Sequence, residues 1–226
     1  MHDELIQDRR VAPSILSADF SKLGAQLDEV MSAGARVIHV DVMDGHFVPP
    51  ITIGPLVVES IREQVNGAGG FLDVHLMIER PERQIEAFAS AGADMITIHQ
   101  EATPHVHYAL KAIREAGCMA GLAINPGTAL ETVIDVRALV DNVLCMTVNP
   151  GWGGQAFIPA SVGRVTRLRK LLPPGLAIEV DGGVDERTAG PCAEAGATLF
   201  VAGSAIFGAP DPAAAYGAIA AAAGAA

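Results

Sequence analysis

Four side chains able to bind a metal ion stand at or near the ends of short apolar segments. His39 and Asp41 belong to one such segment, while His75 and Asp181 belong to two others. Residues two apart on a strand face the same way, so His39 and Asp41 can reach one point. Taken singly, each is more often a buried polar residue that a neighbour satisfies. Four of them in apolar surroundings favour a divalent metal site, with zinc first and ferrous iron, manganese or cobalt as alternatives.

Three more polar residues lie in the predicted strands. Asp73 and Glu179 precede His75 and Asp181 by two residues, so they face the same way one step deeper. They either orient the metal ligands or pair with backbone groups, and the sequence leaves both interpretations open. His99 ends another apolar segment, where it is either a partner of the ligands or an ordinary buried polar residue.

Glycine-rich turns follow three later apolar segments. Backbone N–H groups that no Cβ obstructs can surround a phosphate group. The turns contain no lysine or arginine, so backbone amides and a serine hydroxyl would bind the dianion. One such turn would be weak evidence because tight turns also need glycine, but three predict a phosphorylated small-molecule ligand. The residues are Gly151, Trp152, Gly153, Gly154, Gly182, Gly183, Gly203 and Ser204.

Residue types that are missing at the strand ends narrow the chemistry. The three lysines fall in helical patterns, so none can form a Schiff base at a strand end. No nucleophile elbow or dinucleotide fingerprint occurs, and we therefore expect no nucleotide or flavin cofactor. Met43, Met77 and Met146 either fill the core or form an apolar lining near the metal ligands.

Short apolar segments alternate with helical patterns along the whole chain. In one helical pattern, for example, Leu23, Leu27 and Val30 share a face. Strands that alternate with helices indicate parallel pairing and right-handed crossovers. Eight such units without a linker predict one domain over residues 1–226, an α/β protein of the (β/α)8 TIM-barrel type, with an open doubly wound sheet as the weaker alternative. The expected strands are Val11–Leu16, Val37–Val42, Phe71–Met77, Met95–His99, Met119–Ile124, Val143–Val148, Leu176–Asp181 and Leu199–Ala202.

The predicted barrel brings the two groups of chemical residues together. In this fold, active sites form at the carboxyl ends of the strands and in the loops that follow them. The metal ligands and the glycine turns both stand there, so we expect them to share one pocket.

Composition indicates the general class of protein. The 226 residues are 50% hydrophobic and 18% charged, with a formal net charge of −11. Such an acidic chain repels nucleic-acid backbones and anionic lipids, so we expect neither nucleic acid nor a membrane as partner. The first residues do not resemble a signal peptide, and Cys118, Cys145 and Cys192 are unpatterned, which is typical of a cytoplasmic protein with buried thiols. Apolar helix faces such as the one at Leu168 lead us to expect a homo-oligomer.

Longer motifs in the chain resemble the ribulose-phosphate 3-epimerase family over essentially the whole length and in order. The combination is highly specific, although Trp152 stands where the family more often has phenylalanine. The motifs are APSILSADF from Ala12 to Phe20, HVDVMDGHFVP from His39 to Pro49, DVHLM from Asp73 to Met77, MTVNPGWGGQ from Met146 to Gln155, EVDGGV from Glu179 to Val184 and VAGSAIF from Val201 to Phe207.

The resemblance implies a metal-dependent barrel that interconverts D-ribulose 5-phosphate and D-xylulose 5-phosphate through an enediolate. It identifies Asp41 and Asp181 as the acid/base pair, one for each face of the intermediate. It also identifies both aspartates, with His39 and His75, as the metal ligands. Ser14 and His75 correspond to substrate contacts, and the glycine turns correspond to the phosphate cradle.

Two other functions stay open at this point. A 3-epimerase for another ketose phosphate, such as D-allulose 6-phosphate, would share this chemistry and differ only at the sugar end. A catalytically silent phosphate-binding barrel would have no need of the complete histidine and aspartate set.

Overall fold

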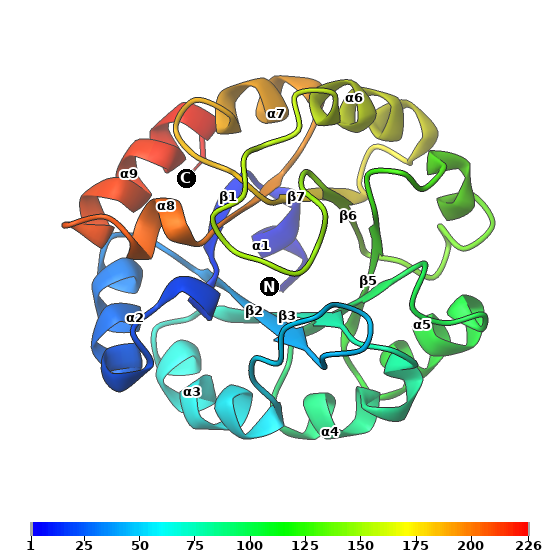
Figure 1. Ribbon diagram of the computed structural model, residues 1–226, viewed down its shortest axis with the longest axis horizontal. Helices are drawn as coiled ribbons and strands as arrows, with labels where there is room; N and C mark the ends of the chain where they lie inside the picture. The colour runs from blue at the N-terminus through cyan, green and yellow to red at the C-terminus, as the bar shows by residue number, and fades with distance from the viewer. Residues whose placement is uncertain (1, 226) are drawn as a thin grey trace.

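Eight parallel strands form a barrel that is seen end-on in Figure 1. The computed structural model describes residues 2–225. Neighbouring strands pair in the order β1-β8-β7-β6-β5-β4-β3-β2, and a parallel bridge between Ser14 and His39 links β1 to β2. This arrangement confirms the predicted TIM barrel. The strands are β1 (Arg10–Pro13), β2 (Val37–Met43), β3 (Phe71–Met77), β4 (Met95–His99), β5 (Met119–Ile124), β6 (Asn142–Met146), β7 (Ala177–Asp181) and β8 (Leu199–Ala202).

Helices surround the barrel and connect most of its strands. The connection from β5 to β6 differs, because it carries the short 3-10 helix η4 (Leu130–Val133) in place of an α-helix. The α-helices are α1 (His2–Gln7), α2 (Leu23–Ser32), α3 (Pro55–Gly67), α4 (Ile85–Ser90), α5 (Val106–Glu115), α6 (Ser161–Leu171), α7 (Ala189–Ala195), α8 (Ser204–Phe207) and α9 (Pro212–Ala223). Further 3-10 helices are η1 (Ile15–Ser17), η2 (Phe20–Lys22) and η3 (Pro81–Arg83).

Alternation along the strands divides the apolar side chains into two groups. Outward residues such as Val40, Val74 and Ile96 pack against the surrounding helices. Inward residues at the amino-terminal end of the barrel form a second cluster with Ile6 of α1, which lies inside the ring in Figure 1. That end is therefore filled with apolar side chains, and the carboxyl end is left for a pocket. The inward cluster contains Ala12, Val37, Phe71, Met95, Ala177, Leu199 and Val201.

Two strands end earlier than the sequence predicts. β1 stops at Pro13 because the Ser14 hydroxyl accepts the N–H of Leu16 and starts η1. β6 stops at Met146, after which the Ile158 N–H donates to the Thr147 carbonyl and draws in the end of the following loop. The other strands agree with the prediction to within one residue at each end.

The structure also bears on membrane-spanning helices and on the cysteines. Within residues 2–225, no helix has the length and apolar character needed to cross a bilayer. The three cysteines are buried free thiols, as expected.

Candidate active site

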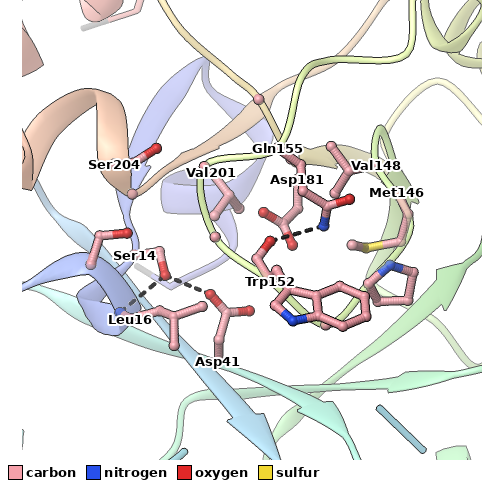
Figure 2. Close-up of a pocket in the computed structure, with 18 of the residues that line it drawn as sticks. Ser14, Leu16, Asp41, Met146, Val148, Trp152, Gln155, Asp181, Val201 and Ser204 are labelled. Carbon is pink, nitrogen blue, oxygen red and sulfur yellow. Dashed lines mark hydrogen bonds between the residues drawn. The ribbon is translucent and has the colours of Figure 1, made fainter. Parts of the chain in front are cut away.

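A pocket opens at the carboxyl end of the barrel, where both predicted groups of residues meet. Figure 2 shows Asp41 and Asp181 entering it from different sides, with Trp152 and Ser204 around its rim. His39 and His75 are fully buried next to it. The predicted residues that line the pocket are Ser14, Asp41, Met43, Met77, Met146, Gly151, Trp152, Gly153, Gly154, Asp181, Gly182, Gly183, Gly203 and Ser204.

The four predicted metal ligands lie in one cluster. One nitrogen or oxygen atom from each of His39, Asp41, His75 and Asp181 lies within 4.8 Å of the others. Asp41 Oδ1 is 3.2 Å from His39 Nε2 and 3.1 Å from His75 Nδ1. His75 Nδ1 is also 3.7 Å from Asp181 Oδ2. Two imidazole nitrogens and two carboxylates facing one point are a donor set that fits a divalent cation.

Strand pairing explains why these side chains converge. His39 and Asp41 point the same way from β2, and the register with β3 sets Asp41 opposite His75. Ser14 follows β1, and its hydroxyl donates to Asp41 Oδ2 at 2.5 Å. Asp41 therefore has one oxygen held by Ser14 and the other directed at the imidazoles.

Burial and neighbouring charges push the pKa values of the two aspartates apart. Burial raises the pKa of Asp41, but the charge on His39 and its hydrogen bond to Asp41 outweigh burial and lower that pKa below its usual range. Burial raises the pKa of Asp181 well above its usual value, and the charge on Asp41 adds to the rise. The crowded carboxylates thus repel one another, which is an environment that attracts a cation.

The two histidines titrate differently. Burial lowers the pKa of His39, but the charges of Asp41 and Asp73 outweigh burial and raise it well above its usual value. Burial lowers the pKa of His75 to about 4, with a further contribution from the charges on His99 and His39. His75 is therefore a neutral imidazole near neutral pH and has one nitrogen lone pair to offer.

Asp73 orients His39. Its Oδ2 accepts a hydrogen bond from His39 Nδ1 at 2.6 Å, and both side chains are fully buried. In its neutral form, His39 then directs its Nε2 lone pair at Asp41. Glu179 lies farther away, with Oε1 3.4 Å from His39 Nδ1, while its Oε2 accepts from Asn142. Burial, with the charge on Asp73, raises the pKa of Glu179 to about 7.

His75 contacts a series of polar side chains that extends away from the pocket. Its Nε2 lies 2.8 Å from Nε2 of His99, and the two rings are tilted by 24°. His99 Nδ1 lies 3.3 Å from Glu101 Oε2. Glu101 Oε1 accepts hydrogen bonds from the Asn125 N–H and the Thr128 hydroxyl. Of the two interpretations of His99, this geometry favours the partner of a ligand.

The loops after β6, β7 and β8 form the other side of the pocket, and backbone lines much of it. Gly183 adopts φ +66°, and a Cβ there would lie 2.6 Å from the Phe157 nitrogen in the loop after β6. A Cβ on Gly203 would lie 2.9 Å from the Ser17 hydroxyl oxygen. A Cβ at Gly183 would therefore collide with the backbone of the neighbouring loop, and glycine there leaves backbone groups accessible to a ligand such as a phosphate.

Apolar side chains complete the lining. Met43, Met77 and Met146 are each at least 96% buried and also border the pocket, so they serve both the core and the lining. Trp152 is 57% exposed and lies across the pocket mouth in Figure 2. Gln155 holds this loop, because its side-chain amide donates to the carbonyls of Asn149 and Trp152.

Sequence reasoning missed several residues of the site. Glu101 stands two residues after His99, and this spacing alone could have indicated a partner of His99. The other hydrogen-bond partners of Glu101 come from the loop after β5. Gln155 is the last residue of the motif MTVNPGWGGQ, and the sequence indicated no role for it. Leu16 and Ser17 line the pocket only because β1 ends early, and no local pattern indicated this.

Comparison with known sequences gives consistent matches. The ribulose-phosphate 3 epimerase family model matches residues 10–207. A ribulose-phosphate 3-epimerase of Bacillus subtilis is 50% identical over 206 residues, which cover 89% of this chain and 94% of the relative. The Escherichia coli K12 enzyme of that name is 48% identical over 204 residues, with 89% and 90% covered. A chloroplastic ribulose-5-phosphate-3-epimerase of Arabidopsis thaliana is 50% identical, with 89% and 72% covered.

Comparison with solved structures gives TIM barrels of lower sequence identity. A 3-hexulose-6-phosphate synthase superposes with a TM-score of 0.71 at 23% identity, covering 95% of this chain and 99% of that one. The KGPDC of Streptococcus mutans, in a ligand complex, gives a TM-score of 0.75 at 16% identity, with 96% and 97% covered. At these identities the likeness extends to the fold alone.

Proposed function

The chain belongs to the ribulose-phosphate 3-epimerase family and is an isomerase acting on a carbohydrate, and we propose that it inverts C3 of D-ribulose 5-phosphate by proton transfer between Asp41 and Asp181 beside a divalent cation. One observation carries this proposal: two aspartates from β2 and β7 reach one pocket at a cluster of two imidazoles. The same pocket is bordered by glycine turns suited to a phosphate. A phosphorylated ketose would place its sugar oxygens at the imidazoles and aspartates and its phosphate at the glycine turns.

His39, Asp41, His75 and Asp181 are the residues that would hold the cation. Their donor atoms lie within 4.8 Å of one another, and Asp73 orients His39 from behind. Bound there, a divalent cation would act as a Lewis acid toward negative charge that develops on the sugar oxygens. We favour zinc because imidazole and carboxylate ligands both suit it; ferrous iron, manganese and cobalt accept the same ligands.

The two aspartates perform the proton transfers. One carboxylate removes the proton from C3, and the electrons of the broken C–H bond move into a planar intermediate. The other aspartate, in its protonated form, returns a proton to the opposite face, so the configuration at C3 inverts. The two exchange roles in the reverse direction. Ser14 keeps Asp41 in place for this step, because its hydroxyl donates to Oδ2.

The glycine turns bind the phosphate and so place C3 between the two aspartates. Backbone N–H groups of residues 151–154, 182–183 and 203–204, with the Ser204 hydroxyl, would carry the dianion. The methionines give the sugar end an apolar wall, which excludes water from the developing charge.

An assay of purified, zinc-loaded protein with D-ribulose 5-phosphate tests the proposal, with D-allulose 6-phosphate as the competing substrate. We expect conversion to D-xylulose 5-phosphate with the higher kcat/KM on the five-carbon sugar. A higher kcat/KM on the six-carbon sugar would reassign the substrate, and a protein that binds zinc without converting either sugar would contradict the function.

A further inference from the structure

The four candidate metal ligands, His39, Asp41, His75 and Asp181, form what we call the ligand cluster. Its two imidazoles are held in different ways. His39 contacts a buried carboxylate directly, that of Asp73. His75 instead contacts a second imidazole, His99, which in turn contacts Glu101 at the edge of the barrel. The side chain of Glu101 is 25% exposed, and it borders a second cavity outside the pocket. The proton transfers described above use neither His99 nor Glu101.

The hydrogen bond between His75 and His99 has two possible directions. Two ring nitrogens 2.8 Å apart need one proton between them, supplied by either ring. If a neutral His99 donated from Nε2, the lone pair of its Nδ1 would face the Glu101 carboxylate, and two acceptors would oppose each other. If His75 donates from Nε2, His99 donates from Nδ1 to Glu101, and every group in the chain is satisfied.

The surroundings of Glu101 select the second direction. The Asn125 N–H and the Thr128 hydroxyl both donate to Oε1, which leaves Oε2 for His99. Burial raises the pKa of Glu101, but hydrogen bonds from His99, Thr128 and Asn125 outweigh burial and lower it to about 2. The carboxylate is therefore ionised at neutral pH and can only accept hydrogen bonds.

This arrangement of protons determines which nitrogen of His75 has a lone pair facing Asp41 and Asp181. With its proton on Nε2, His75 has a lone pair on Nδ1. That atom lies 3.1 Å from Asp41 Oδ1 and 3.7 Å from Asp181 Oδ2. A nitrogen lone pair and two carboxyl groups that face one place form a donor set for a cation bound between them.

We propose that Glu101, acting through His99, positions His75 so that Nδ1 is directed at the divalent cation. The inference rests on the proposed function, because it assigns His75 as a cation ligand. Glu101 and His99 are positioning residues, since neither reaches the pocket that would hold the sugar. The Phe47 ring, 4.8 Å from the His99 ring between centroids, packs against this chain of side chains.

The substitution Glu101→Gln tests this order of protons. Two donors fix Oε1, so the amide oxygen of glutamine must take that place and the amide NH2 must face His99. His99 then donates to His75, the proton of His75 moves to Nδ1, and the lone pair is lost from the cluster. We expect zinc affinity, measured by chelator competition, to fall roughly 10- to 100-fold, the range found when partners of metal ligands are replaced.

Two other variants separate this effect from loss of charge or loss of folding. Glu79→Gln removes a carboxylate beside the same outer cavity without touching His99, and it should leave zinc affinity unchanged. His99→Leu removes the hydrogen-bonded link between Glu101 and His75. In that background, adding Glu101→Gln should change zinc affinity little, whereas additive losses would overturn the coupling.

Nitrogen-15 NMR of the zinc-loaded protein reads the tautomer of His75 directly. We expect the proton on Nε2 in the wild-type protein. A proton on Nδ1, or zinc affinity of Glu101→Gln equal to that of wild type, would overturn the inference. Absence of epimerase activity in a protein that binds zinc with this tautomer would contradict the proposed function and leave the positioning role intact.

Discussion

The two sides of the pocket are built from different parts of the polypeptide. On one side, the buried side chains of His39, Asp41 and His75 on β2 and β3 and the partly buried Asp181 on β7 form the ligand cluster. Strand register or hydrogen-bonded neighbours place these side chains. On the other side, loops after β6, β7 and β8 present backbone, and glycines after β7 and β8 pack closely against neighbouring loops. The strand side suits bond breaking, because its groups are buried and held in place. The loop side suits binding, because backbone N–H groups recognise a phosphate without taking part in the chemistry.

This difference predicts that substitutions on the strand side lower kcat and those on the loop side raise KM. The largest effect is expected for Asp41→Asn and Asp181→Asn. Each removes one proton-transfer group, so kcat should fall about 10²–10⁴-fold or more while the fold is retained. Steady-state kinetics at saturating zinc measure this effect. Asp28→Asn, an exposed substitution on α2, is the matched control, and substantial turnover by either variant of the pair would contradict the two-aspartate scheme.

Removal of divalent cations should have the next largest effect. Loss of a Lewis acid worth several kcal/mol should lower kcat by at least about 10²-fold, and added zinc should restore it. Elemental analysis of the chelated protein must accompany the assay. Full activity in protein shown to be free of metal would contradict a role of the cation in catalysis.

On the loop side, Gly183→Ala should raise KM more than it lowers kcat. The new Cβ would lie 2.6 Å from the Phe157 nitrogen, so the turn must move and displace N–H donors from the phosphate. One lost hydrogen bond to a charged group is worth about 1.5–3 kcal/mol, which is roughly 10- to 100-fold in affinity.

Gly117→Ala is the control for Gly183→Ala. Gly117 also has a positive φ, +84°, but a Cβ there meets nothing within 4 Å and the residue lies outside the pocket. We expect this variant to lose stability through backbone strain and to keep its KM. Equal KM values for the two variants would show that strain, not loop position, is responsible.

The smallest effect is expected at the rim. Trp152→Ala removes an aromatic side chain that is 57% exposed, a contact worth roughly 0.5–1.5 kcal/mol, so KM should rise roughly two- to tenfold. Trp152→Phe should behave like wild type. Tyr108→Ala, on the outer helix α5, removes a similarly exposed ring and should leave the kinetics unchanged. A large fall in kcat for Trp152→Ala would break the division between the two sides.

The sequence predicted residues on both sides of the pocket, but it did not locate every strand end. β3, β4 and β5 were located to the residue, because their buried apolar runs leave no alternative register. His39 and Asp41 on β2 and His75 on β3 follow by simple alternation along their strands. The early end of β1 depends on a local contact, the Ser14 hydroxyl to the Leu16 N–H, which competes with strand pairing.

Contacts between distant segments account for what the sequence left open. The role of Asp73 became clear only from its contact with His39 on the neighbouring strand. Glu101 depends on Thr128 and Asn125 in a separate loop, so no pattern around residue 101 could indicate its direction. The absence of an α-helix between β5 and β6 is a similar case, since helical periodicity alone did not distinguish the short η4.

Solvent-deuterium exchange at C3 by the single variants Asp41→Asn and Asp181→Asn, at saturating zinc, tests the central claim most directly. Each variant keeps one proton-transfer group on one face of the sugar. Each should therefore exchange the C3 hydrogen of a single epimer without interconverting the two, and the two variants should act on opposite epimers. Exchange of both epimers by one variant, or of the same epimer by both, would contradict the account.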